Sequence, residues 1–136
     1  MMEQLILSIT LSWIIAKIIK TIIAWNKEKK FEWKELLYDG GMPSTHTVLV
    51  VSTATAIYLE RGLSIYFVLS IVLALIVMND AMKVRWVTQE QSKVINNLTK
   101  GKKDFPVLDE HVGHTPMEVL VGIVFGIIIP IIVYSL

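Results

Sequence analysis

The sequence contains no cysteine among its 136 residues, and charged residues make up only 18% of it. The lack of cysteine excludes disulfide bonds and thiolate metal sites. Hydrophobic residues account for 54% of the chain, a share too high for an ordinary soluble domain of this length. Because the length leaves room for one domain, residues 1–136, the composition favours a single membrane-embedded domain.

The apolar residues fall into four long runs, at about residues 5–25, 42–59, 63–81 and 117–136. A helix needs roughly 20 apolar residues to cross a bilayer, so each run predicts a transmembrane helix. The first run has no basic segment before it and no small-residue cleavage site after it, and we expect it to be retained. The predicted fold is an all-α, polytopic membrane helical bundle of four spans.

The basic residues predict the orientation of this bundle. Four spans place both termini on one side of the membrane and the connections 26–41 and 82–116 on the other. Of the 13 lysines and arginines, only Arg61 lies on the side of the termini. By the positive-inside rule, we expect a multi-pass protein of the cell membrane with cytoplasmic connections and both termini outside.

Two features are predicted in the connections. Residues 31–38 (FEWKELLY) form an amphipathic pattern that predicts a short helix at the membrane interface. The third span is expected to continue as a helix to about Lys100, since apolar residues recur at helical spacing, and Gly101 is a plausible stop. The segment from Gly101 to Gly113 is then a loop.

The fourth span begins with a strong local signal. Thr115, Pro116 and Glu118 supply a capping threonine, a proline at the first helical position and a glutamate three residues after the cap. Further along, Gly122 and Gly126 form a small-xxx-small pair, which predicts the close approach of another helix.

Four groups of polar residues gather at the predicted cytoplasmic face. They are Lys20 and Lys27, the segment 40–46 (GGMPSTH), Asp80 with Arg85, and the segment 111–118. Ionisable residues in or beside membrane spans are costly, so they are functional candidates by default. Unrelated charges would scatter over both ends of the spans. The convergence of these four groups at one face therefore predicts a functional site.

The chemistry of these groups favours an anion. Lysines and an arginine supply positive charge, and Ser44 and Thr45 lead into a helix whose N-terminus attracts anions. The two histidines His46 and His114 could share the roles of nucleophile and general acid. Glu118, four residues after His114, is placed to accept a hydrogen bond from its ring and fix the tautomer.

Each candidate also has a structural interpretation. These are a capping role alone for Glu118, hydrogen bonding within the bundle for His46, topology signals for Lys20 and Lys27, an ion pair for Asp80 and Arg85, and a solvated loop position for His111. A histidine at the interface is likewise the simplest reading of His114 taken alone. These alternatives stay open on residue pattern alone.

The motifs resemble those of the type 2 phosphatidic acid phosphatases, which share a fold with vanadium haloperoxidases. The sequence from Pro43 to His46 (PSTH) is similar to that family's PSGH motif. The sequence from His114 to Glu118 (HTPME) resembles the end of SRxxxxxHxxxD, with glutamate for aspartate. Lys20 and Lys27 resemble KxxxxxxRP, with lysine for arginine and no proline. The longer strings GGMPSTH, DAMKVRW and GHTPMEVLVG are closest to a divergent bacterial and plant branch.

This resemblance implies a phosphatase that uses neither metal nor cofactor. In that case His114 attacks phosphorus to form a phosphohistidine, His46 protonates the leaving alcohol, and Glu118 orients His114. Lys20, Ser44, the backbone at Thr45 and an arginine would hold the phosphate oxygens. The expected substrate is a lipid phosphate among the surrounding membrane lipids, such as phosphatidylglycerophosphate, phosphatidic acid or a prenyl (di)phosphate, and no nucleic-acid partner is expected.

The sequence departs from the family pattern in two ways. The serine and arginine of the third motif fall on Val107 and Leu108, and Arg85 is the candidate replacement. Four spans are also fewer than the family's usual six, so a homodimer is one way to close the cavity. The rival interpretations are an inactive protein that binds a lipid phosphate or a partner, and a small anion-transporter subunit.

Overall fold

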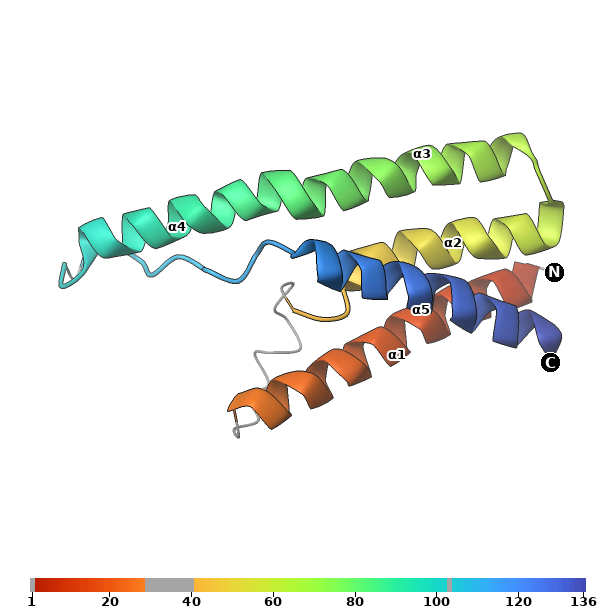
Figure 1. Ribbon diagram of the computed structural model, residues 1–136, viewed down its shortest axis with the longest axis horizontal. Coiled ribbons are helices and arrows are strands. Elements are labelled where there is room, and N and C mark those ends of the chain that lie inside the picture. Colours follow the sequence, from red (N-terminus) through yellow and green to blue (C-terminus); the bar gives the residue numbers. More distant parts are fainter. Residues whose placement is uncertain (1, 29–40, 103) are drawn as a thin grey trace.

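The computed structural model describes residues 2–28, 41–102 and 104–136, and every regular element in these ranges is helical. In chain order the elements are α1 (Met2–Glu28), α2 (Thr45–Arg61), α3 (Ile65–Asn79), the π-helical turn η2 (Asp80–Val84), α4 (Arg85–Thr99) and α5 (Pro116–Ser135). Helices α1, α2, α3 and α5 form a bundle with both chain ends at one end of it (Figure 1). From the other end, α4 continues the line of α3, and the chain then returns to the start of α5.

Helix α2 lies at the centre of the bundle and contacts α1, α3 and α5. The closest approach is to α5 and depends on two glycines. A Cβ at Gly122 would lie 2.9 Å from Cβ of Thr47, and one at Gly126 would lie 2.7 Å from Cβ of Val51. The prediction that these glycines admit another helix is confirmed. Small residues allow α1 to pack closely as well, since Ser8, Ser12 and Ala16 are all fully buried.

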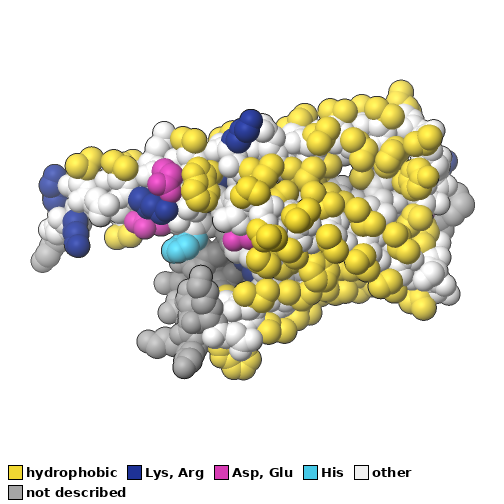
Figure 2. All heavy atoms as spheres, viewed as in Figure 1, with side chains coloured by type: hydrophobic (Ala, Val, Ile, Leu, Met, Phe, Trp, Pro, Cys, Tyr) yellow, Lys and Arg dark blue, Asp and Glu magenta, His cyan; other side chains and the backbone are white. Residues whose placement is uncertain are grey.

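Among the described residues, three helices are long and apolar enough to cross a membrane, at Met2–Asn26, Ile65–Thr99 and Pro116–Ser135. On the visible face, hydrophobic side chains cover the bundle, whereas charged side chains gather toward α4 (Figure 2). The second predicted span corresponds to α2, which has only 17 residues and several serines and threonines. The count of four spans is therefore not confirmed. The predicted interfacial helix at 31–38 lies outside the described residues.

The helix running from α3 through η2 to α4 extends well beyond the bundle. Its 35 residues, Ile65–Thr99, correspond to about 52 Å at 1.5 Å per residue, whereas the hydrocarbon core of a bilayer is about 30 Å thick. The predicted continuation to about Lys100 is confirmed, since α4 ends at Thr99. Gly101 follows with φ +85°, a left-handed conformation that favours glycine at a helix end.

Candidate functional site

The π turn η2 frees one backbone carbonyl in the middle of a long helix. In an α-helix the N–H of Arg85 would donate to Ala81, but here it donates to the carbonyl of Asp80, five residues back. The carbonyl of Ala81 instead accepts the backbone N–H of His114, with N and O 3.1 Å apart. The irregular turn therefore anchors the segment that carries the predicted nucleophile.

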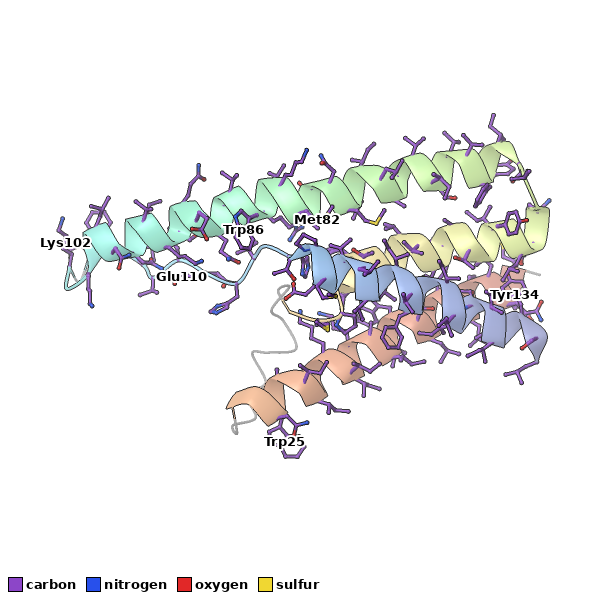
Figure 3. All side chains as sticks on the ribbon, in the orientation of Figure 1. Trp25, Met82, Trp86, Lys102, Glu110 and Tyr134 are labelled. Atoms are coloured by element: carbon purple, nitrogen blue, oxygen red, sulfur yellow. The ribbon has the colours of Figure 1, made fainter. Side chains whose placement is uncertain are left out.

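Gly113 allows this segment to lie directly against the helix. A Cβ at Gly113 would come within 2.8 Å of Cα of Trp86, so any larger residue would push the chain away. The N–H of Gly113 also donates to Oε1 of Gln89, at 3.2 Å. Figure 3 labels Trp86 on α4 and Met82 in the π turn, at the level where α5 begins.

Asn96 fixes the middle of the loop between α4 and α5. Its amide nitrogen donates to the carbonyl of Leu108 at 2.9 Å and to Oε1 of Glu110 at 2.7 Å. Its amide oxygen accepts the N–H of Leu108 at 2.9 Å. Because one side chain satisfies both backbone groups of Leu108, the loop follows the surface of α4 back to the bundle. Glu110, labelled in Figure 3, lies on this loop beside α4.

His114, which is buried, and Glu118, which is partly buried, form a pair at the start of α5. Nδ1 of His114 lies 3.1 Å from Oε2 of Glu118, and His114 is 1% exposed. A carboxylate can only accept a hydrogen bond, so Nδ1 carries the hydrogen, and in the neutral imidazole the lone pair is on Nε2. Nε2 is buried and has no hydrogen-bond partner among the described residues. The pair thus presents a buried imidazole lone pair of fixed orientation.

Glu118 also caps its own helix. Oε2 accepts the backbone N–H of Thr115 at 3.2 Å, and the N–H of Glu118 donates to Oγ1 of Thr115 at 3.3 Å. This is the predicted capping box. The two interpretations of Glu118 from the sequence are therefore compatible in the structure, because one carboxylate oxygen serves both the helix end and the His114 ring.

His46 lies next to this pair, in the first turn of α2. Its ring centroid is 6.2 Å from that of His114, with the ring planes at 62°. A direct backbone bond holds the two helix starts together, since the N–H of Ser44 donates to the carbonyl of Glu118 at 3.1 Å. The registration of His46 against His114 is therefore set by the main chain.

Ser44 and Thr45 are almost fully buried at the N-terminus of α2. Oγ of Ser44 accepts the backbone N–H of Thr47 at 3.4 Å and the hydroxyl of Thr47 at 3.0 Å. With its oxygen accepting two hydrogen bonds, the Ser44 hydroxyl can use its own hydrogen as a donor toward a ligand. Helix α2 therefore begins with a buried donor and the positive end of its dipole at the same place.

Lys20 of α1 completes this cluster. It is only 6% exposed, its ammonium interacts electrostatically with Glu118, and a Cβ on Gly41 would lie 3.6 Å from its Cε. The side chain is thus held between α1 and the residues before α2. Lys27 lies in the last turn of α1, and its side chain falls outside the described part of the chain.

Asp80 and Arg85 form the ion pair that was one interpretation of the sequence. Nε of Arg85 donates to Oδ2 of Asp80 at 3.1 Å, and both side chains are partly exposed. The five-residue spacing fits the π turn, which places these two residues on one face. His111 lies elsewhere, with its side chain 82% exposed on the loop beside Asp109. Within the described residues, no group of three or more His, Asp or Glu side chains could hold a metal ion.

The structure brings together six of the nine site residues proposed from the sequence: Lys20, Ser44, Thr45, His46, His114 and Glu118. The supporting residues Gln89, Asn96 and Gly113, and the carbonyl of Ala81, were missed. The apolar and polar periodicity of α4 was a usable signal for Gln89 and Asn96. No simple sequence signal marks a π turn, because its one-residue shift in hydrogen bonding leaves the composition unchanged.

The fold and site define a helical membrane protein with a histidine–carboxylate pair at one end of the bundle. Comparison with known proteins agrees with this class, since the family described as "Divergent PAP2 family" matches residues 1–129. The chain belongs to this family. A relative is the "Uncharacterized membrane protein YuiD" of Bacillus subtilis (strain 168), 36% identical over an alignment of 136 residues that covers 88% of this chain and 86% of the relative. No solved structure matches.

Replacing Asn96 with alanine is predicted to release the loop from α4. The variant loses the bonds to both backbone groups of Leu108, and part-buried hydrogen bonds of this kind contribute about 0.5–1.5 kcal/mol each. We expect faster amide exchange at residues 104–113 and a lower melting temperature in detergent. Asn97→Ala is the matched control, since Asn97 is exposed on the same helix. Equal exchange in the two variants would contradict the role of Asn96.

Proposed function

We propose that this protein is a membrane lipid-phosphate phosphatase, which hydrolyses a phosphomonoester or diphosphate through a phosphohistidine intermediate. The observation that carries the proposal is the His114–Glu118 pair, in which Nδ1 is held by a carboxylate and the lone pair on Nε2 is buried. A base or nucleophile oriented by a third group is the usual arrangement for covalent catalysis.

In the proposed reaction, Nε2 of His114 attacks phosphorus while the bond from phosphorus to the lipid oxygen breaks. His46 in its protonated form donates a proton to the leaving oxygen, so that the lipid alcohol departs neutral. The phosphorylated His114 ring carries a positive charge with hydrogen on Nδ1, and the carboxylate of Glu118 stabilises it. Water, deprotonated by His46, then attacks phosphorus, releasing inorganic phosphate and restoring the Nε2 lone pair.

Phosphate binding is assigned to the groups around this pair. The hydroxyl of Ser44, the backbone at Thr45 and the ammonium of Lys20 lie at the positive end of the α2 dipole, which favours a doubly charged anion. We assign the role of the missing third-motif arginine to Arg85, whose guanidinium is oriented by Asp80. Lys27 is assigned to the same face. Val107, one of the two residues at the family's Ser-Arg position, is 89% exposed on the loop.

A groove beside the site supports a lipid as the substrate. It lies between α2, α3 and α5, measures about 470 Å³, and has a lining that includes Val51, Phe67, Ala74, Ile123 and Ile127. Val51 is two helical turns from Ser44 on α2, and Ile123 is five residues from Glu118 on α5. The groove therefore begins close to the proposed phosphate site and follows the same helices, which suits a hydrocarbon chain.

The lysine asymmetry supports a site at the cytoplasmic face, with both termini outside. Substrates made on the inner leaflet then reach it directly, and phosphatidylglycerophosphate, phosphatidic acid and prenyl (di)phosphates all carry the required group. The reaction is proposed to be independent of metal ions, because side chains supply both the nucleophile and the acid.

The test is phosphate release from a panel of these lipids by the purified protein in detergent without added metal. Wild type should release phosphate, and His114→Ala should abolish it. Glu118→Gln should reduce kcat by about 10²–10⁴-fold, since the ring loses its orienting carboxylate. His111→Ala is the control, because that histidine is exposed on the loop. Equal release by wild type and His114→Ala would refute the mechanism, and loss of release on adding a chelator would refute metal independence.

The groove gives a second prediction, on α5. Ile127→Trp should raise KM about tenfold for a long-chain lipid phosphate, because excluding two methylene groups costs about 1.6 kcal/mol. KM for a water-soluble phosphomonoester should not change. Ile128→Trp is the matched control, since Ile128 is exposed and does not line the groove. A similar change in KM for both substrates would contradict the assignment of the groove.

A further inference from the structure

Helix α4 and the last residue of η2 carry an apolar stripe that the proposed reaction does not use. It consists of Val84, Val87, Gln91, Val94 and Leu98, at alternating spacings of three and four residues. The four apolar members are 58%, 53%, 59% and 71% exposed, and Gln91 is exposed as well. Large apolar side chains lined up in this way on one helix face indicate a surface that binds something.

The opposite face of α4 is already occupied. Gln89, Ser92 and Asn96 point toward the loop that leads to His114, and Ser92 is buried. At 100° per residue the centre of this set lies about 150° from the centre of the stripe. Figure 2 accordingly shows hydrophobic side chains along the edge of α4 that faces away from the loop. The stripe is therefore a second, separate surface.

The direction of α4 argues against the membrane as its partner. Helices α3 and α4 form one nearly straight rod (Figure 1), so α4 leaves the bundle along the line of a membrane span. An amphipathic helix that binds the bilayer surface lies flat in the interface. The length in excess of the bilayer core, about 22 Å, matches the 15 residues of α4 at 1.5 Å each. The stripe thus faces water unless another protein covers it.

We propose that the partner is a second copy of this chain, bound through a parallel two-stranded coiled coil of α4. The stripe fits the a and d positions of a heptad repeat, with Val84, Gln91 and Leu98 at a and Val87 and Val94 at d. Ile95, which is 43% exposed, lies at the e position and widens the seam on one side, whereas Trp86, 41% exposed, lies on another face of the helix. Gln91, the one polar member, meets its counterpart in the second copy and fixes the register.

The membrane supplies the geometry that this pairing needs. Two copies inserted with the same topology present their α4 helices in parallel, as a twofold axis along the membrane normal requires. The seam spans only two heptads, which is short for a coiled coil in solution. Anchoring by α3 raises the effective concentration of one α4 near the other, and this lowers the cost of association.

The dimer has a structural consequence that does not depend on the proposed reaction. Pairing along one face of α4 braces the helix whose other face holds the loop at Gln89 and Asn96. Because a stable helix is the support for that loop, dimerisation would order the segment that ends at His114. The proposed site itself remains within one copy, since its six grouped residues come from α1, from α2 and its N-cap, and from α5 and the segment just before it.

Single cysteines test the proposal cleanly, because the chain has no cysteine of its own. Val87→Cys and Val94→Cys, each oxidised in native membranes, should form disulfide-linked dimers, since d positions face each other in a parallel pair. Lys93→Cys is the matched control on a different face of the same helix and should stay monomeric. Equal cross-linking at Lys93→Cys, or none at Val87→Cys and Val94→Cys, would overturn the proposal.

A double variant adds a measurement that does not rely on cross-linking. Val87→Lys with Val94→Lys places like charges across the seam, and both residues are exposed, so the fold of the monomer should persist. We expect wild type to be a dimer by light scattering in mild detergent and the variant to be a monomer with an unchanged helical circular-dichroism spectrum. Capture of a different protein by Val94→Cys, or quenching of a fluorophore at that position by brominated lipids, would instead identify another occupant and refute the dimer.

Discussion

The hydrogen bond from His114 to the carbonyl of Ala81 is the interaction on which the arrangement of the site depends. A regular α-helix has no carbonyl to spare at this depth, and the π turn provides one by shifting the N–H of Arg85 to Asp80. A second backbone bond, from Ser44 to the carbonyl of Glu118, joins the starts of α2 and α5. Together these backbone bonds connect α2, α5 and the long helix that contains η2, so the main chain alone sets the position of His114 relative to all three.

The packing of the bundle serves the same end. Gly122 and Gly126 let α5 approach α2 so closely that a methyl group at either position would clash, and the small residues Ser8, Ser12 and Ala16 of α1 are fully buried. Close packing is also what buries Lys20, Ser44 and His114 at the end of an apolar bundle. In such surroundings a fixed charge interacts strongly, which suits the stabilisation of phosphoryl transfer.

The parts of this arrangement that depend on short-range sequence patterns could be predicted from the sequence. The capping box at Thr115 and Glu118 and the glycine pair are local signals, and the structure confirms both. The extension of the third apolar run into α4 was likewise clear from periodicity. The number of spans was harder, because α2 is short and rich in Ser and Thr, as suits a helix surrounded by others. The role of the π turn and the hydrogen bonds from Asn96 to the loop depend on contacts between residues far apart in the sequence, which no local pattern encodes.

The central claim is that Nε2 of His114 attacks phosphorus. The most direct measurement is to mix the purified protein with a long-chain lipid phosphate, quench the reaction within a turnover in alkali, and map phosphorylation by mass spectrometry. A phosphoryl group on His114 of the wild-type chain, absent from His114→Ala, is the predicted result. Phosphate release without any modification of His114, or a phosphoryl group on another residue, would contradict the account.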